Sequence, residues 1–250
     1  MNVLRKTVKV LAADIDVITW QQAISRISSW ATIHQSAYVC ICNVHSVVSV
    51  TQSREFEDIV NQADMATPDG APVAWMIRKQ GYGHQERING PDLMWKYCAH
   101  AEATSESIFL YGGTQTTLDI LKEKLAQHFP QLNIVGMYSP PFRPLSAEED
   151  QSIISQINKS GAGTVWVSLG CPKQEKWMAE HKGKINAVMI GVGAAFDYHA
   201  GTILRAPLWM QRNGLEWLHR LCSEPRRLWK RYLVTNSLFV FHVLKNVIGK

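Results

Sequence analysis

The sequence predicts an α/β fold in which a mostly parallel sheet carries helices on both faces. Short, continuously apolar runs alternate with segments that carry helix start signals, as buried parallel strands alternate with their covering helices. The charge is uneven: residues 201–250 hold nine basic and two acidic residues, a net charge of +7, whereas residues 1–200 carry −2. We therefore expect a core over residues 1–200 and a basic, aromatic-rich C-terminal appendage over residues 201–250.

The first half of the chain predicts one strand among several helices. Thr19 and Gln22 match a capping box, which marks a helix start. The apolar run 38–42 predicts a strand that ends at Asn43. The segment 67–70 (Thr-Pro-Asp-Gly) predicts a tight turn, because proline fixes φ and glycine accepts a positive φ. Helices are expected over residues 20–31, 53–60 and 72–79, and from about residue 91.

The second half repeats a unit of strand, turn and helix. Leucines at positions 118, 121 and 125 form a helix stripe that Pro130 ends. Ser146 with Glu149 matches a second capping box, and a further helix is expected over residues 173–181. The strands of this half are expected at residues 108–111, 134–138, 165–169 and 187–190.

Glycines and polar residues gather directly after the predicted strands. They are Asn43 and His45, the turn 112–114, the turn 170–174 and the segment 191–197. Because the carboxyl ends of parallel strands lie at one edge of a sheet, these turns should share a rim, and ligands of such folds bind there. The sequence therefore predicts a ligand site on this rim.

Asp69 has two interpretations from its surroundings alone. A carboxylate between Pro68 and Gly70 sits on a short, rigid bend, from which it is well placed to remove a proton. A Pro-Asp-Gly segment is also an ordinary surface turn.

Composition places the chain among ordinary globular proteins. Hydrophobic residues make up 46% and charged residues 19%, which excludes a disordered protein. We expect neither a signal peptide nor a spanning helix, because no apolar run of suitable length exists. The five cysteines form no ligand pattern, so we expect reduced thiols in a cytoplasmic protein.

Three short motifs could serve other chemistry. Gly112-Gly113-Thr114 before a helix suits either a phosphate or a plain turn with Thr114 as N-cap. The segment 191–196 lacks the third glycine of a dinucleotide fingerprint, which argues against a dehydrogenase. Asp14-Ile15-Asp16 has the form of a metal-binding Asp-x-Asp, but we interpret it as a strand end or turn. We therefore expect no metal site and no cofactor.

The appendage interleaves arginines with tryptophans, which three kinds of partner could explain. Basic and aromatic residues together suit nucleic acid, an anionic membrane surface or a diphosphate. The confinement of these residues to one end, together with the glycine-rich rim, disfavours nucleic acid. A solvated cationic helix with no partner is a further interpretation, beside the membrane surface and the diphosphate.

Several motifs resemble the WecG/TagA/CpsF family, also called glycosyltransferase family 26, and the resemblance covers roughly residues 10–235. They lie, in the family's order, at residues 67–70, 86–93, 170–175, 191–207 and 214–227. The resemblance implies a Rossmann-like core with a C-terminal appendage that closes over the site and contacts the membrane. It further implies a metal-independent, inverting transfer of a hexose from a UDP-sugar to a polyprenyl-diphosphate-linked saccharide, at the inner face of the cell membrane, in making surface polysaccharides such as exopolysaccharides.

The resemblance also implies roles for single residues. The catalytic aspartate matches Asp69. Residues that bind the substrate match Asn43, Arg87 and Gln174, with Thr67 expected beside them; Ile41 replaces a threonine of some members. Nucleotide-binding positions are expected at Gly112, Gly113, Gly170, Pro172, Gly193 and Asp197. Arginines for the leaving diphosphate are expected at Arg220, Arg227 and either Lys230 or Arg231.

Two other classes of function stay open at this point. A nucleic-acid-binding protein would use the cationic appendage, and a non-catalytic nucleotide-binding regulator would use the rim without Asp69 as a base. The sequence does not fix which hexose is transferred, among N-acetylmannosamine, its uronic acid and glucose. It also leaves open a homo-oligomer.

Overall fold

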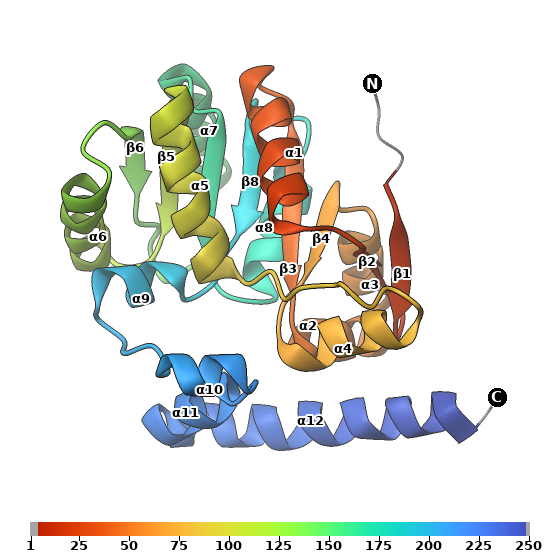
Figure 1. Cartoon of the computed structure of the whole chain (residues 1–250). Helices are drawn as coiled ribbons and strands as arrows, with labels where there is room; N and C mark the ends of the chain where they lie inside the picture. Colours follow the sequence, from red (N-terminus) through yellow and green to blue (C-terminus); the bar gives the residue numbers. More distant parts are fainter. Residues whose placement is uncertain (1–4, 249–250) are drawn as a thin grey trace.

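The computed structural model describes residues 5–248 and contains a sheet of six strands (Figure 1). The order across the sheet is β4-β3-β8-β7-β5-β6, and every neighbouring pair is parallel. All six carboxyl ends therefore lie along one edge, which we call the rim. The strands are β3 (Ala37–Cys42), β4 (Met65–Pro68), β5 (Ser107–Gly112), β6 (Asn133–Tyr138), β7 (Thr164–Ser168) and β8 (Val188–Gly191).

Helices cover both faces of the sheet, which confirms the predicted fold class. Side chains alternate along each strand, so Val39 of β3 joins one hydrophobic cluster and Cys40 the other. The face of Val39 is covered by α1 (Trp20–Thr32), α5 (Gly90–Thr104), α6 (Gln115–His128) and α9 (Ala195–Ala200). The face of Cys40 is covered by α2 (Val44–Gln52), α3 (Arg54–Asn61), α4 (Ala71–Lys79), α7 (Ala147–Ser160) and α8 (Lys173–His181).

Helix start signals in the sequence are confirmed where a side chain caps the first turn. Thr19 and Ser146 each form the complete reciprocal capping box. Ser53 and Thr114 accept a hydrogen bond from the backbone of the third helical residue. These caps explain why the two helices that follow capping boxes begin at the predicted residues.

The predicted turn at Thr67 and Pro68 is wrong, because these two residues end strand β4. β4 lies at the edge of the sheet and pairs with β3 alone, where Pro68 opposes Cys42. A proline lacks the N–H that a central strand needs but is accepted at an edge. The bend itself lies two residues after the end of β4, at Gly70, whose φ of +85° favours glycine.

Helix α2 and an N-terminal hairpin are elements that sequence patterns did not predict. Three buried valines in α2 have a β-branched shape that favours strands, and tertiary burial overrides that preference. The hairpin pairs β1 (Thr7–Val10) with β2 (Ala13–Asp16) in antiparallel fashion.

Asp16 ends β2, which confirms the interpretation of Asp14-Ile15-Asp16 as a strand end. Its buried carboxylate accepts hydrogen bonds from Arg5 Nε at 3.0 Å, Arg26 Nη1 at 3.1 Å and the Ala66 N–H at 2.7 Å. Both carboxylate oxygens are thus bonded within the protein.

The appendage forms a layer beneath the core in Figure 1. It contains α10 (Leu208–Arg212), α11 (Glu216–Ser223) and α12 (Pro225–Ile248), and α12 packs along α2. Phe239 of α12 packs in the core cluster of Cys40 and Leu228 is also buried, whereas Trp229, Leu233, Val240 and Leu244 are each more than half exposed. None of the helices within residues 5–248 has the length and apolar character needed to cross a bilayer. Lys250, which contributes to the charge of the appendage, lies outside the described residues.

Candidate functional site

Asp69 lies on the rim, one residue beyond the end of β4. Its backbone N–H donates to the Cys42 carbonyl oxygen at 2.9 Å, which ties it to the end of β3. Asn43 is next along β3 and caps α2, with its Oδ1 accepting the Ser46 N–H at 3.2 Å. Two of the predicted site residues, Asp69 and Asn43, therefore sit side by side at the carboxyl ends of neighbouring strands.

The environment of Asp69 favours its protonated form. Burial raises the pKa of its carboxyl to about 6, with Glu216 adding to the rise and Arg87, the Gly70 N–H and Arg205 opposing it. A carboxylate with this pKa is ionised above about pH 6 and holds a proton more tightly than an exposed aspartate. Such a group is suited to take a proton near neutral pH.

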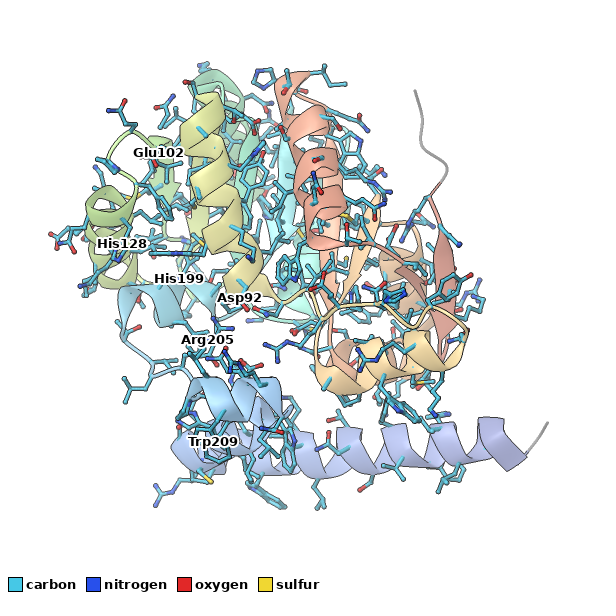
Figure 2. All side chains as sticks on the ribbon, viewed as in Figure 1. Asp92, Glu102, His128, His199, Arg205 and Trp209 are labelled. Atoms are coloured by element: carbon cyan, nitrogen blue, oxygen red, sulfur yellow. The ribbon has the colours of Figure 1, made fainter. Side chains whose placement is uncertain are left out.

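Arg87 is held by the appendage. Its Nη1 makes an ion pair with Glu216 of α11 and approaches the Gln211 carbonyl oxygen at 3.5 Å. Arg205 also links the appendage to the core, because it donates to both carboxylate oxygens of Asp92, at 2.6 and 3.1 Å. Figure 2 shows Arg205 between Asp92 of the core and Trp209 of α10. Charged pairs thus fasten the appendage directly beside Asp69.

Gln174 is buried at the carboxyl ends of β7 and β8, and its amide bonds within the protein. Its Oε1 accepts the Gly193 N–H at 3.0 Å, and its Nε2 donates to Glu175 Oε1 at 2.9 Å. Glu175 is 2% exposed, and burial raises the pKa of its carboxyl. In this arrangement Gln174 fixes the loop after β8.

Thr67 and the glycine turn after β5 have structural contacts. Thr67 is fully buried and donates to the Ile88 carbonyl oxygen at 3.2 Å. A Cβ on Gly112 would lie 2.4 Å from the Ser168 carbonyl oxygen, and the Gly113 N–H donates to the same oxygen at 3.1 Å. With Thr114 as N-cap, these contacts show that residues 112–114 form a tight turn before α6.

The remaining predicted nucleotide positions also lie on the rim. The Gly170 carbonyl oxygen accepts the Gln174 N–H at 3.0 Å, and Pro172 precedes the first residue of α8. The Asp197 carboxylate in α9 accepts a hydrogen bond from Thr202 Oγ1 at 3.2 Å.

The appendage arginines differ in their surroundings. The guanidinium of Arg227 pairs with Glu224 at 2.7 Å and its side chain is 61% exposed. Arg220 lies 3.9 Å from Glu224, and Arg231 stacks over the Tyr232 ring. Three arginine Nε groups are buried and have no hydrogen-bond partner among the described residues: those of Arg205, Arg220 and Arg231. Buried donors without partners are costly unless a ligand fills the space.

His45 adds an unpaired group beside Arg231. Its Nδ1 is buried and lacks a hydrogen-bond partner within the described chain. Burial, with the charge of Arg231 acting in the same direction, lowers the pKa of His45 to about 4. The ring is therefore neutral at pH 7.

Sequence reasoning missed the roles of Asp92, Arg205 and Glu216. One signal was available, since Glu216 is one of only two acids in the basic appendage. Which arginine each acid pairs with depends on how the appendage folds back, and no local pattern carries that information.

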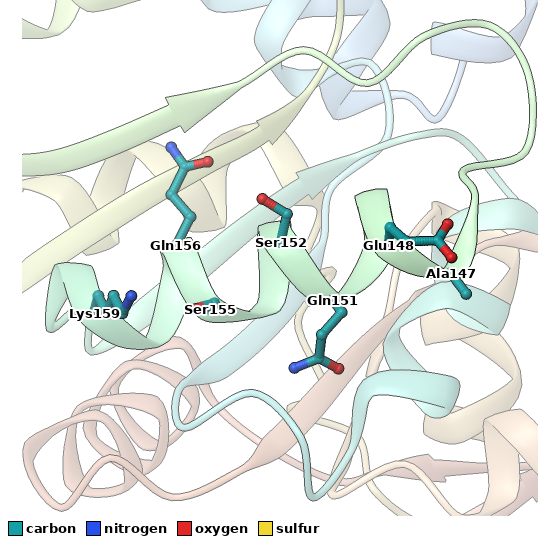
Figure 3. A pocket seen from close by; sticks show the side chains of 7 residues that line it. All are labelled: Ala147, Glu148, Gln151, Ser152, Ser155, Gln156 and Lys159. Atoms are coloured by element: carbon teal, nitrogen blue, oxygen red, sulfur yellow. The ribbon is translucent and has the colours of Figure 1, made fainter.

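Two surface hollows lie away from the rim. One is lined by seven residues of α7 alone, Ala147 to Lys159, and is open to solvent (Figure 3). The other lies between α3 and α8, beside Tyr38 at the opposite end of β3. Within residues 5–248, no group of three or more His, Cys, Asp or Glu side chains is arranged to hold a metal ion.

Comparison with known proteins relates the chain to a protein family and, among other relatives, to a bacterial transferase. The model of the family described as "Glycosyl transferase WecG/TagA/CpsF family" matches residues 8–250. A Bacillus subtilis (strain 168) protein, N-acetylglucosaminyldiphosphoundecaprenol N-acetyl-beta-D-mannosaminyltransferase, is 32% identical over 199 residues, which cover 79% of this chain and 75% of that protein.

Proposed function

The chain belongs to the WecG/TagA/CpsF family of glycosyl transferases, and from this we propose that it moves a hexose from a UDP-sugar to a polyprenyl-diphosphate-linked saccharide. One observation carries the proposal. A carboxylate whose pKa is raised to about 6 lies on a rim that faces the appendage, in which three buried arginine Nε groups make no hydrogen bond among the described residues. The name of the Bacillus subtilis relative, an N-acetylmannosamine transferase with a lipid-diphosphate acceptor, supports the acceptor class.

The proposed reaction is a single displacement. Asp69 takes the proton of an acceptor hydroxyl, and that oxygen attacks the anomeric carbon of the donor sugar from the face opposite UDP. The bond from the anomeric carbon to the diphosphate breaks, and UDP leaves with its electron pair. Arg87 orients the donor, while Gln174 keeps the loop of Gly193 in place.

Departing UDP gains negative charge, and we propose that Arg220 and Arg231 stabilise it. Their buried Nε groups lack partners, so a diphosphate oxygen would satisfy them without displacing an existing hydrogen bond. Arg227 is exposed and paired with Glu224, and we therefore give it no direct contact with the diphosphate. We propose that these arginines replace a metal ion, so that EDTA leaves the rate unchanged.

A donor panel tests the proposed function. We expect UDP-sugars to raise the unfolding temperature of the protein, because a ligand that binds only the folded state stabilises it. One of them should then support transfer to a prenyl-diphosphate-linked sugar, measured by mass spectrometry of the lipid product. GDP-sugars serve as the control. Stabilisation by no UDP-sugar and transfer from none of them would refute the proposal.

We also propose that the appendage attaches the protein to the inner face of the cell membrane. The exposed residues Trp229, Leu233, Val240 and Leu244 recur at helical spacing along one side of α12. Exposed Arg226 and Lys230 lie near them, and each basic residue close to an anionic leaflet contributes about 1 kcal/mol of binding.

Replacing Trp229 and Leu233 by serine should weaken membrane binding. We expect the double variant to lose most of its cosedimentation with phosphatidylglycerol vesicles, because the apolar side chains that enter the bilayer are gone. Phe142→Ser is the matched control, since Phe142 is 97% exposed and lies outside the appendage. Equal sedimentation of wild type and double variant would contradict a role for this side of α12.

A further inference from the structure

Glu216 is one of two acidic residues in the basic appendage, and it pairs with an arginine of the core. Its carboxylate forms the ion pair with Arg87, and its Oε1 lies 3.6 Å from Arg205 Nε. Glu224, the second acid, pairs with Arg220 and Arg227 inside the appendage. Glu216 is thus the carboxylate through which α11 reaches the core residue expected to orient the donor.

The contact continues as a row of alternating charges. Arg87 is followed by Glu216, then Arg205, then Asp92, whose Oδ2 accepts a hydrogen bond from Asn89 Nδ2 at 2.6 Å. Each guanidinium in the row therefore faces a carboxylate, and each of the two carboxylates faces a guanidinium. Without Glu216, the only hydrogen bond that the Arg87 guanidinium would keep to the described part of the appendage is the 3.5 Å contact with the Gln211 carbonyl oxygen.

Glu216 also acts on Asp69 through charge. The groups that face Asp69 are Arg87 before α5, Arg205 before α10 and Glu216 itself, with the Cys42 thiol at the end of β3. The two arginines attract the ionised carboxylate of Asp69, and Glu216 repels it.

Glu216 has neighbours of its own besides Arg87 and Arg205. One of them is Tyr198 of α9. Burial raises the pKa of its phenol, and the charge of Glu216 acts in the same direction. The charged and titratable groups around Glu216 thus come from the core, from α9 and from the segment before α10.

We propose that Glu216 is a positioning residue of the transfer reaction, which holds Arg87 in place for the donor and adds a negative charge near Asp69. This inference rests on the proposed function. Glu216 touches neither reactant; it acts through Arg87 by an ion pair and through Asp69 by repulsion. Its loss should therefore change donor binding and the pH profile together.

Two variants separate the two effects. Glu216→Gln keeps the shape but removes the charge, so the acid limb of kcat/KM against pH should move to lower pH, because Asp69 then loses its proton more readily. The KM for the donor should rise on the order of tenfold, since a hydrogen bond to a charged group is lost. Glu216→Asp keeps the charge but shortens the side chain, so it should raise KM and leave the acid limb near its wild-type position.

Glu149→Gln is the matched control, because Glu149 also pairs with an arginine, Arg143, but on the surface beside α7. It should change neither KM nor the acid limb. Thermal unfolding followed by circular dichroism shows that each variant is folded before its kinetics are compared. A wild-type protein that transfers no hexose would refute the proposed function. A working wild type whose KM and acid limb are unchanged in Glu216→Gln would refute the positioning role alone.

Discussion

Replacing Asp69 by asparagine should lower kcat by roughly 10² to 10⁴-fold, the usual contribution of a general base. Asparagine has nearly the same shape, and the backbone bond from residue 69 to the Cys42 carbonyl is unaffected by the change. The amide cannot take a proton from the acceptor hydroxyl. Donor binding should therefore persist while turnover falls, which steady-state kinetics and UDP binding by calorimetry would measure.

The stability of the same variant provides a control for folding. The pKa of Asp69 is about 6 in the folded protein against an ordinary value of 3.8, so the folded state binds the proton more tightly than the unfolded state. Its contribution to stability is therefore lost as pH rises through about 6. Asparagine has no such loss, so Asp69→Asn should unfold at a higher temperature than wild type at pH 8.

Exposed Asp119 on α6 offers a matched substitution, because Asp119→Asn removes a carboxylate that is not among the charges acting on Asp69. It should leave kcat unchanged. Near-wild-type transfer by Asp69→Asn, with UDP binding intact, would show that another group takes the proton.

The sheet and most of its helices could be predicted because local signals and burial agree there. Thr19 and Ser146 carry capping boxes, and β5, β7 and β8 are apolar runs in the sequence that lie buried in the structure. Strand β4 was missed because Pro68 signals a turn unless the strand is known to be at an edge. Edge position is a property of the whole sheet, which no short segment encodes.

The rim could be predicted from the sequence, but its contacts could not. Parallel strands bring their carboxyl ends together, so the neighbourhood of Asn43 and Gln174 follows from the strands predicted before them. Asp69 reaches the rim through β4, which was not predicted. The ion pair between Arg87 and Glu216 joins residues 129 positions apart. It depends on how α10 and α11 fold back onto the core, which no local sequence pattern predicts.

The glycine turn at residues 112–114 is explained by packing within the sheet. A close approach of Gly112 to the Ser168 carbonyl leaves no room for a side chain. The glycine is therefore required by the sheet itself, whether or not a ligand binds nearby.

Replacing Arg231 by glutamine should produce the other large loss of activity. Removing one donor that meets charge developing in the transition state typically lowers kcat by about 10² to 10³-fold. The buried Nε of Arg231 has no hydrogen-bond partner among the described residues, so the folded structure should lose little when it is removed. Arg220→Gln should act in the same direction, and Arg231→Lys should recover only part of the rate, because an ammonium lacks the planar fork of a guanidinium.

Arg226→Gln is the control, since Arg226 lies on the same helix but is exposed. Product inhibition by UDP should weaken in Arg231→Gln and stay unchanged in Arg226→Gln. Removing the charge of Arg231 should also raise the pKa of His45, which NMR titration of the imidazole can follow, whereas burial will still hold that pKa below its ordinary value of 6.5. A raised pKa of His45 combined with wild-type kcat and UDP inhibition would place Arg231 beside His45 but remove it from the leaving-group site. The charge on departing UDP would then have to be stabilised by Arg220 and other basic residues of the appendage.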